Sequence, residues 1–383
     1  MTFKEFSATF FQKLKNSYKS SHAKKLYASI LCILLGLIVG FIVLLCLSPS
    51  NAAFEFITLI TGGLSYSGVD GIFSILLRAA PLICCGLSIC FSSKAGMFNI
   101  GAAGQYVIGV FGSLLFALYV KAPWYVCILM AMFLASIYGA IPGVLKAFLN
   151  VNEVISGIML NWIGLYFVNY SFQTYLSSCV DITKGAKTFV ISQINPSAAI
   201  PDFGLKSSVS VYFNIAIFLA IIITIIISLI LNKTTFGYRI KASGMNRDAT
   251  KYAGMNDKAS IVSSMAISGA LAGLGAALYY LSGIEEWSVQ LSTSLPALPW
   301  NGIIVAFIGQ LSPVACIFSS IFTTTLSVGA RSMTQTIFPA EIADLITGIV
   351  VYLSGLTNLF YMLMNKYIFS KKFRRPWKKK GAE

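Results

Sequence analysis

The chain has 383 residues, of which 57% are hydrophobic and only 11% are charged, and its mean hydropathy is +0.79. Soluble globular domains carry about 25% charged residues, so this composition excludes an ordinary soluble fold and predicts that most of the chain faces lipid or packs inside a helix bundle. The formal net charge of +15 would suit a nucleic-acid-binding protein. However, the basic residues cluster between apolar runs, as in polytopic membrane proteins, and we expect no nucleic-acid partner.

Apolar runs predict an all-α polytopic membrane protein with about ten transmembrane helices, some of them broken or re-entrant. The expected spans, in chain order, are 27–47, 72–92, 100–120, 123–149, 154–176, 210–231, 260–282, 300–311, 313–331 and 342–363.

The distribution of lysine and arginine predicts that both termini are cytoplasmic. Six lysines precede the first apolar run, six basic residues lie in the loop 232–258, and eight follow the last run. We therefore expect a basic cytoplasmic segment (1–26), a transmembrane domain (27–363) and a basic cytoplasmic tail (364–383). The tail sequence KKFRRPWKKK also suits contact with anionic membrane lipids.

Two predicted spans are interrupted. Residues 91–110, FSSKAGMFNIGAAGQYVIGV, are polar and rich in glycine at membrane depth, and the apolar run 300–311 is too short to cross a bilayer. Such backbone is tolerated in a membrane only inside protein or along a water-filled cavity. Both segments contain an Asn followed later by Gly-Gln, and paired interruptions in two halves of a transporter point to its pathway, although the similarity is faint enough to arise by chance.

Two loops are long. The loop 177–209 is expected outside, either capping the pore, contacting an external partner or forming a tolerated surface insertion. The loop 232–258 is expected in the cytoplasm, with a short helix over 247–253 that begins at an Asn246 cap. Composition alone allows either a docking surface or an ordinary basic cytoplasmic loop there.

Four stretches of the chain, in this order over about residues 72–330, read LRAAPLICCGLSICFSSKAGMFNIGAAGQ (77–105), NEVISGIMLNWIGLYFVNY (152–170), GYRIKASGMNRDATKYAGMN (237–256) and SGALAGLGAAL (268–278). On these stretches the chain resembles the permeases of bacterial ATP-binding-cassette importers for nucleosides and simple sugars, within the branched-chain amino acid and ribose permease superfamily. Within that family it is similar to the longer of two permeases that pair in nucleoside importers.

The resemblance implies a mechanism and a set of partners. It implies a permease that imports nucleosides by alternating access across a bacterial cell membrane. It also implies a second permease in a heterodimer with this chain, two ATPase subunits or domains, and an external substrate-binding lipoprotein. The loop 232–258 would carry a coupling helix that sits in a groove of the ATPase. The residues that match the coupling motif are Gly237, Arg239, Gly244, Asn246, Arg247, Ala253 and Gly254.

Two departures from the family pattern leave the substrate open. Ala103 stands where the family often has an acidic residue, and residues 309–313 read GQLSP where it often has GKNNP. Both changes remove a charge near the expected pathway. The sequence therefore does not decide between nucleosides and simple sugars, or between bases.

The candidate residues of the translocation pathway are polar or aromatic side chains at or near the interruptions. Asn99 and Gln105 are amides in the broken segment, Phe98 precedes them, and Asn161 and Trp162 lie within the span 154–176. A buried Asn in a membrane either serves function or makes a helix–helix hydrogen bond. Trp162 is equally compatible with ordinary packing.

Groups for catalysis are missing. The sequence has no G-x-x-x-x-G-K-[ST] phosphate loop, no catalytic dyad and no cysteine or histidine spacing typical of a metal site. We expect a chain that is not an enzyme and holds no cofactor or metal, with ATP and Mg²⁺ bound by a partner ATPase. An ion-coupled secondary carrier is the alternative class, but the predicted spans have almost none of the acidic residues it would need.

Overall fold

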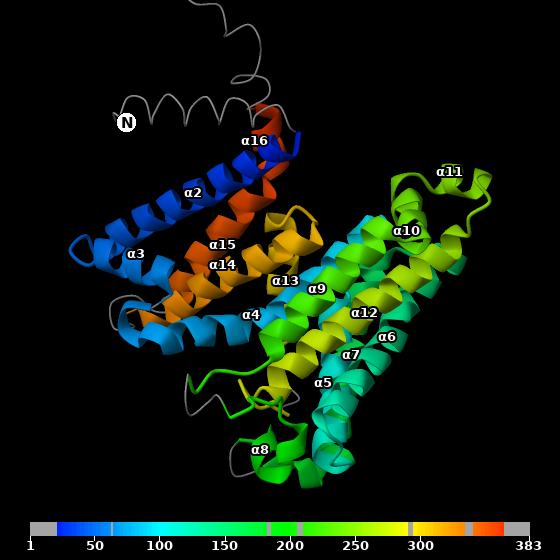
Figure 1. Cartoon of the computed structure of the whole chain (residues 1–383), viewed down its shortest axis with the longest axis horizontal. Coiled ribbons are helices and arrows are strands. Elements are labelled where there is room, and N and C mark those ends of the chain that lie inside the picture. Colours follow the sequence, from blue (N-terminus) through cyan, green and yellow to red (C-terminus); the bar gives the residue numbers. More distant parts are fainter. Residues whose placement is uncertain are drawn as a thin grey trace, which may run out of the picture. The chain divides into compact units, whose positions relative to one another are not determined.

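The computed structural model describes residues 21–62, 64–181, 185–204, 210–289, 294–333 and 340–363. Within this part the regular structure is almost entirely helical (Figure 1), which confirms the predicted all-α class. The strands described are β1 (Val180–Asp181) and β2 (Lys187–Thr188), a short antiparallel pair. Predictions for the extreme N-terminal segment and for the tail 364–383 lie outside the described residues.

The chain forms two compact units. One comprises Thr58–Ser332, and the other comprises the described residues up to Ile57 and from Met333 onward. The helices, in chain order, are α2 (Ser21–Leu47), α3 (Ala52–Thr61), α4 (Leu64–Lys94), α5 (Ala102–Leu114), η1 (Leu115–Tyr119), α6 (Trp124–Leu149), α7 (Glu153–Thr174), η2 (Ser177–Cys179), α8 (Ile191–Ile194), η4 (Pro196–Ala198), α9 (Ala216–Lys233), α10 (Thr235–Met245), α11 (Arg247–Tyr252), α12 (Asp257–Leu281), α13 (Ala297–Ile308), α14 (Pro313–Ser332), α15 (Ala340–Gly355) and α16 (Thr357–Leu363).

Seven helices in the described residues are long and apolar enough to cross a membrane: α2, α4, α5 with η1, α6, α9, α12 and α14. They support a multi-pass membrane protein, whereas the predicted count of ten spans is not confirmed. Helix α7 occupies the predicted span 154–176 but is more polar. Helix α13 has only 12 residues, in keeping with the short element predicted at 300–311. The last predicted span, 342–363, is divided into α15 and α16.

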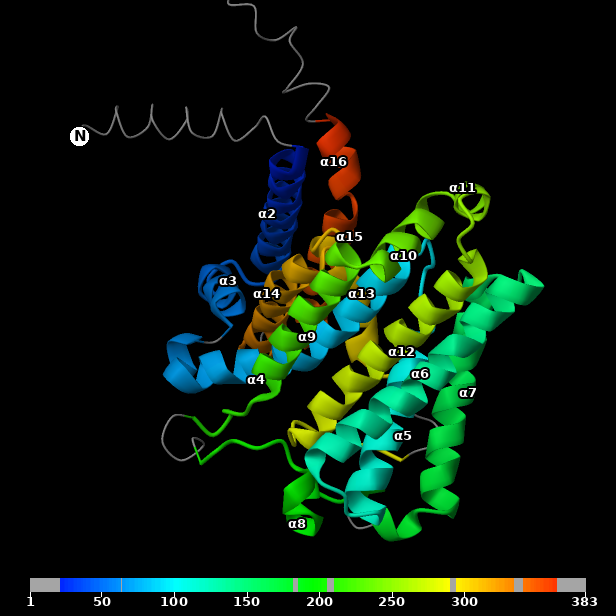
Figure 2. The same ribbon diagram turned by 45° about the vertical axis from the view of Figure 1, so that its right-hand side comes forward.

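Small residues let helices approach closely in both units. In the terminal unit, α2 packs on α15, and a Cβ added to Gly36 would lie 2.7 Å from the Val350 Cα. In the larger unit, α12 packs against α4, α5 and α6 (Figure 2). A Cβ on Gly109 of α5 would lie only 2.5 Å from the Gly273 Cα of α12, so the small residues of 268–278 form a packing surface.

The segment 91–110 does break, as its composition predicts. Helix α4 ends at Lys94, α5 begins at Ala102, and residues 95–101 between them form turns. Gly96 takes a positive φ of 72° in this connection, a conformation in which glycine carries no steric penalty. Ala95, Met97 and Asn99 in this connection are buried, whereas Gly96 is exposed.

The loop that follows α7 folds back onto the larger unit. Asn195 donates hydrogen bonds from its Nδ2 to the carbonyl oxygens of Ala117 and Ala122, both at 3.0 Å. The Thr188 amide donates to the Trp287 carbonyl oxygen at 2.9 Å. This part of the predicted outside loop is thus attached to the backbone near residue 287.

Candidate functional site

Two buried amide side chains, Asn99 and Gln105, form hydrogen bonds with each other at the break between α4 and α5. Asn99 is 0% exposed, and its Nδ2 donates to the Gln105 Oε1 and to the Ser268 Oγ, both at 2.7 Å. The Gln105 Nε2 donates back to the Asn99 Oδ1 at 3.1 Å. Ser268 also donates to the Ser88 carbonyl oxygen. The cluster therefore connects α4, α5 and α12 at one point.

Asn161 makes a similar connection from α7. Its Oδ1 accepts a hydrogen bond from the Gly104 amide at 2.7 Å, and its Nδ2 donates to the Ile100 carbonyl oxygen at 3.0 Å. The first turn of α5 has backbone amides without helical partners. The Asn161 side chain accepts from one of them, that of Gly104, and donates to the carbonyl oxygen of Ile100, two residues before α5 begins. The sequence predicted these amides as pathway residues. In this structure their hydrogen-bonding groups are occupied within the chain, and the pathway role stays a prediction.

The two aromatic candidates lie apart from the amide cluster. Phe98 is half-buried, and its ring lies 6.2 Å from that of Phe307. Trp162 is 42% exposed and stacks on Tyr166 with 6.0 Å between ring centroids. Trp162 and Tyr166 belong to an exposed side of α7 that also carries the large residues Ile155, Met159, Ile163 and Tyr170.

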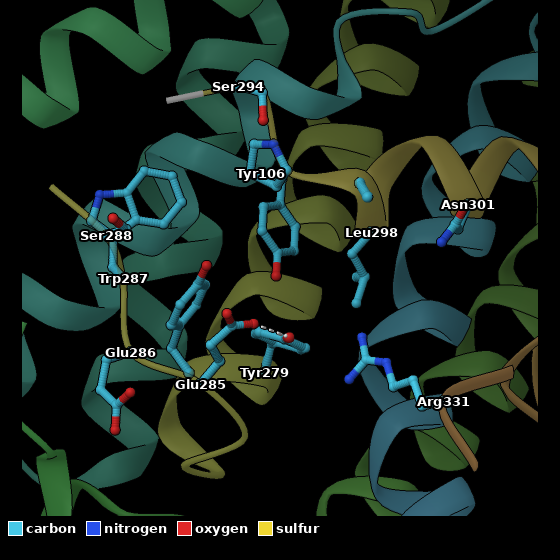
Figure 3. Close-up of a pocket in the computed structure, with 13 residues that line it drawn as sticks. Tyr106, Tyr279, Glu285, Glu286, Trp287, Ser288, Ser294, Leu298, Asn301 and Arg331 are labelled. Carbon is cyan, nitrogen blue, oxygen red and sulfur yellow. Dashed lines mark hydrogen bonds between the residues drawn. The ribbon is translucent and has the colours of Figure 1, made fainter. Parts of the chain in front are cut away.

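A cavity of about 320 Å³ lies beyond the C-terminal end of α12, within the larger unit (Figure 3). This volume is near the lower end of the range for small-molecule sites. Aromatic side chains form much of its wall, with acidic, basic and amide groups beside them. The lining residues are Tyr106, Tyr279, Tyr280, Glu285, Glu286, Trp287, Ser288, Ser294, Pro296, Ala297, Leu298, Asn301 and Arg331.

The polar groups of the cavity are held in place. The Tyr279 hydroxyl donates a hydrogen bond to the Glu285 Oε2 at 2.8 Å. Figure 3 shows the Tyr106 ring and the Arg331 guanidinium pointing toward the same space as this pair, and Glu286 lying farther from Arg331. The Trp287 Nε1 donates to the buried Asn169 Oδ1 at 3.0 Å. The strand-like segment around Trp287 is thereby tied to α7.

The predicted coupling residues lie at the opposite end of α12. Helix α11 begins after Asn246, whose Oδ1 accepts from the Ala249 amide at 3.0 Å, which confirms the expected cap. Gly254 follows α11 with a φ of 74°. Two large apolar side chains project from this loop, Met245 at 84% and Tyr252 at 94% exposure.

Three of the other predicted coupling residues, Gly237, Gly244 and Arg247, contact the helix bundle. Gly237 at the start of α10 is buried against the end of α9, whereas Arg239 is exposed. A Cβ on Gly244 would meet the Lys94 carbonyl oxygen and lie 2.8 Å from the Gly96 nitrogen. Arg247 contacts the Met97 sulfur at 3.5 Å. The loop therefore rests directly on the broken segment 94–97.

An ion pair attaches the same end of the bundle to α7. Lys146 of α6 and Glu153 of α7 lie 2.9 Å apart. Burial alone would raise the pKa of Glu153, but hydrogen bonds from Lys146 and from its own backbone amide, with the positive charges of Lys146 and Arg247, lower it overall. Glu153 is thus held as a carboxylate between α6, α7 and the loop.

Sequence reasoning missed most of the cavity. It noted Asn301 only as part of a faint repeat. Tyr279 and Tyr280 looked like the end of an apolar span, and Glu285 and Arg331 like ordinary loop charges. The one available signal was the cluster of aromatic and charged residues over 279–287, directly after a helix rich in small residues.

The family comparison decides the class of this chain. The model of the family described as branched-chain amino acid transport system / permease component matches residues 71–355. The chain belongs to this family. No solved structure matches.

This chain is similar to named transporter permeases over most of its length. It is 30% identical to the nucleoside ABC transporter permease protein NupB of Lactococcus lactis, covering 95% of this chain and 100% of NupB. It is 29% identical to the guanosine ABC transporter permease protein NupP of Bacillus subtilis, covering 93% and 98%. A more distant relative is the glucose ABC transporter permease protein TsgB13 of Haloferax volcanii, 25% identical over 73% of this chain and 75% of TsgB13.

Proposed function

We propose that this chain is the membrane-spanning permease subunit of an ATP-driven importer of nucleosides. The observation that carries the proposal is that a cavity rich in aromatic and polar groups and an exposed docking loop lie at opposite ends of one buried helix. Helix α12 has 25 residues, about 37 Å at 1.5 Å per residue, which exceeds the hydrocarbon thickness of a bilayer. The near full-length similarity to NupB and NupP favours nucleosides over sugars.

The loop 232–258 is the proposed contact with the ATPase. Met245 and Tyr252 are large apolar side chains exposed on a polar loop, and such residues act as anchors when they enter a pocket of a partner. Gly244 and Arg247 pack on segment 94–97. A movement of the loop would therefore be transmitted directly to residues 94–97, with no other helix between them.

A second permease is the proposed neighbour of α7. Tyr166 and Trp162 lie near the middle of this helix and are exposed, whereas tyrosine and tryptophan at a lipid surface concentrate at the membrane interfaces. Polar hydroxyl and indole groups at the centre suit a protein or water-filled surface better than lipid. We propose that this face of α7, together with Phe98 in the break between α4 and α5, adjoins the pathway shared with the second permease.

The remaining partners follow from the class of transporter. Two ATPase subunits would supply hydrolysis of ATP with Mg²⁺, and an external substrate-binding lipoprotein would deliver the solute. The cavity would then face outward and both termini would lie in the cytoplasm, in agreement with the positions of the basic clusters.

Uptake measurements test the proposal. In cells, uptake of labelled nucleoside should be lost when the partner ATPase gene is deleted and should persist after addition of an uncoupler. An ion-coupled carrier would behave in the opposite way. Uptake of glucose but not of nucleoside by the same cells would replace the proposed substrate with a sugar.

A further inference from the structure

We propose that α13 transmits movement of the loop 232–258 to the cavity, and that the turn after it, residues 309–312, is the hinge on which α13 moves. This inference rests on the proposed ATP-driven import and names the element that moves during it. It depends on three features of the larger unit: a strained turn, contacts between that turn and the break between α4 and α5, and the position of α13 in the cavity wall.

The turn 309–312 contains two adjacent residues in an uncommon backbone conformation. Gln310 and Leu311 have φ values of 51° and 55°, and residues that carry a Cβ are disfavoured in this left-handed region. Gly309, which would have no such penalty, has an ordinary φ of −73° instead. The turn is therefore strained, and backbone strain of this kind persists only where the surrounding structure holds it.

Hydrogen bonds from two directions hold the turn. The Gln310 amide donates to the Phe307 carbonyl oxygen at 2.9 Å, and the Leu311 amide donates at 2.8 Å to that of Ala306. This is the Schellman pattern at the end of a helix, in which glycine is the usual residue at the position of Gln310. The Leu311 carbonyl oxygen also accepts a hydrogen bond from the Cys90 Sγ at 2.9 Å. Because Cys90 lies near the C-terminal end of α4, this bond attaches the strained turn to the helix that leads into the break.

The C-terminal end of α13 also contacts the break directly. The ring of Phe98, in the break, lies 6.2 Å from that of Phe307 in the last turn of α13. The loop 232–258 contacts the same break, because Gly244 packs on segment 94–97. A displacement of this segment by the loop would therefore act on the turn through the end of α4 and on α13 through Phe98.

The other end of α13 forms part of the cavity wall. Ala297, Leu298 and Asn301 of this helix line the cavity (Figure 3). A helix of 12 residues is about 18 Å long, so a tilt about the turn 309–312 displaces these three residues farther than it displaces the turn. Hinges of this kind, at the end of an element, are the usual way in which a small local change becomes a larger movement. A tilt of α13 would thus change the shape of the cavity.

Glycines let α13 pack closely on α4. A Cβ added to Gly302 of α13 would lie 2.6 Å from the Cys85 Cβ, and one added to Gly86 of α4 would lie 2.6 Å from the Val305 Cγ1. Contacts between small residues bring two helix backbones close together. We therefore expect α13 to follow a displacement of the end of α4.

A rigid connector is the alternative interpretation of the same turn. In that case the strain would affect stability alone, whereas a hinge would set the balance between two positions of α13. Two substitutions of Gln310 separate these interpretations, because they act on the turn in opposite directions. Asparagine adopts the left-handed conformation readily, whereas valine, which is branched at Cβ, is strongly disfavoured there. Gln310→Asn should therefore favour the described turn, and Gln310→Val should favour a conformation that leaves it.

Distance measurements between spin labels test the hinge in the assembled importer. The labels are attached at Ala297→Cys in α13 and Ser178→Cys in η2, both exposed positions of the larger unit, in a Cys46→Ser parent that lacks the exposed native thiol. The importer, in lipid nanodiscs, is measured without nucleotide and with Mg²⁺ and a half-saturating non-hydrolysable ATP analogue, which should produce a second distance. Gln310→Asn should raise the ratio of the distance that matches the described structure to the other one by at least about threefold, and Gln310→Val should lower it by a similar factor.

Lys121 provides the matched control. It is another non-glycine residue with a positive φ, 57°, and it lies in the connection between η1 and α6 instead of the turn after α13. Lys121→Asn and Lys121→Val change the strain of that connection in the same two directions and should leave the ratio of distances unchanged.

The bond from α4 to the turn has its own pair of variants. Cys90→Ser keeps a donor for the Leu311 carbonyl oxygen, so the response to the ATP analogue should be retained. Cys90→Ala removes the donor, and the change in the ratio of distances on addition of the analogue should fall at least about twofold. Equal responses in these two variants would exclude this bond from the transmission.

The outcomes also separate this inference from the proposed function. Unchanged ratios in both Gln310 variants, or shifts in the same direction in both, would overturn the hinge. If uptake depends on the ATPase but the analogue produces no second distance, the role of α13 is overturned and the proposed function stands. Uptake that does not depend on the ATPase would refute the proposed function itself.

Discussion

At the scale of single residues, the buried amides near the break between α4 and α5 form hydrogen bonds with other side chains and with the backbone. Asn99, Gln105 and Asn161 each use both ends of their amide groups around the start of α5. The sequence predicted that these amides matter, because a buried amide in a membrane needs a partner. It did not identify the partners, since Ser268 is 169 residues away from Asn99 along the chain.

Replacing Asn99 by Leu should destabilise the bundle by about 1–2 kcal/mol, because the buried Gln105 side chain would lose both of its hydrogen bonds to Asn99, whereas Ser268 would keep its bond to Ser88. The measurement is unfolding of the purified protein in detergent micelles. Gln105→Leu should have a similar effect, and the double variant should lose less stability than the sum of the two. A strictly additive result would contradict the mutual pairing of the two amides.

The ion pair Lys146–Glu153 gives a pH dependence with a definite sign. The pKa of Glu153 is lower in the folded protein than its ordinary value, so the pair contributes stability above the ordinary pKa of glutamate and loses it as the pH falls toward the lowered value. We expect stability to fall over this acidic range by less than about 1 kcal/mol from this pair. Glu153→Gln should flatten that part of the curve, and an unaltered curve would contradict the assignment.

At the scale of elements, the sequence predicted two of the helix interruptions, but it predicted neither the division of 342–363 nor the cavity. The break in 91–110 and the short helix at 300–311 follow from polar residues and from run length, which are local properties. The division of 342–363 into α15 and α16 was not predicted, because hydropathy measures apolar length and is insensitive to a helix break inside an apolar run. The cavity was missed for a related reason, since it combines α5, α12, α13 and α14.

The contact between α10 and segment 94–97 predicts a coupling defect. Gly244→Ala would push a Cβ against the Lys94 carbonyl oxygen and the Gly96 nitrogen, so α10 has to move away from the break. Substrate-stimulated ATP hydrolysis by the assembled importer should fall at least about tenfold, equivalent to about 1.4 kcal/mol of coupling.

Gly348→Ala is the matched control for this change. Gly348 lies in α15 with open space around its Cα, and alanine is favoured over glycine in a helix. The control should keep normal stimulation. Normal stimulation in Gly244→Ala as well would exclude this contact from the coupling mechanism.

At the scale of the whole molecule, orientation links the chemistry to the direction of transport. The family and seven apolar helices establish a multi-pass membrane protein, and the side of each loop rests on the distribution of basic residues. If the loop 232–258 is cytoplasmic, the cavity at the other end of α12 opens outward, toward a delivered solute. The opposite orientation would place the coupling loop where no ATPase can reach it.

Labelling of single cysteines decides the orientation. Cys46 is an exposed native thiol, so it is first replaced by serine, and Ser178→Cys or Asp248→Cys is then introduced at exposed positions after α7 and in α11. A membrane-impermeant maleimide should label Ser178→Cys in intact cells and Asp248→Cys only after the cells are permeabilised. The remaining native thiols are buried, and the Cys46→Ser parent measures any background from them. The reverse pattern would place the cavity on the cytoplasmic side and would be incompatible with import driven from the loop 232–258, because that loop would then face away from the cytoplasm, where ATP is hydrolysed.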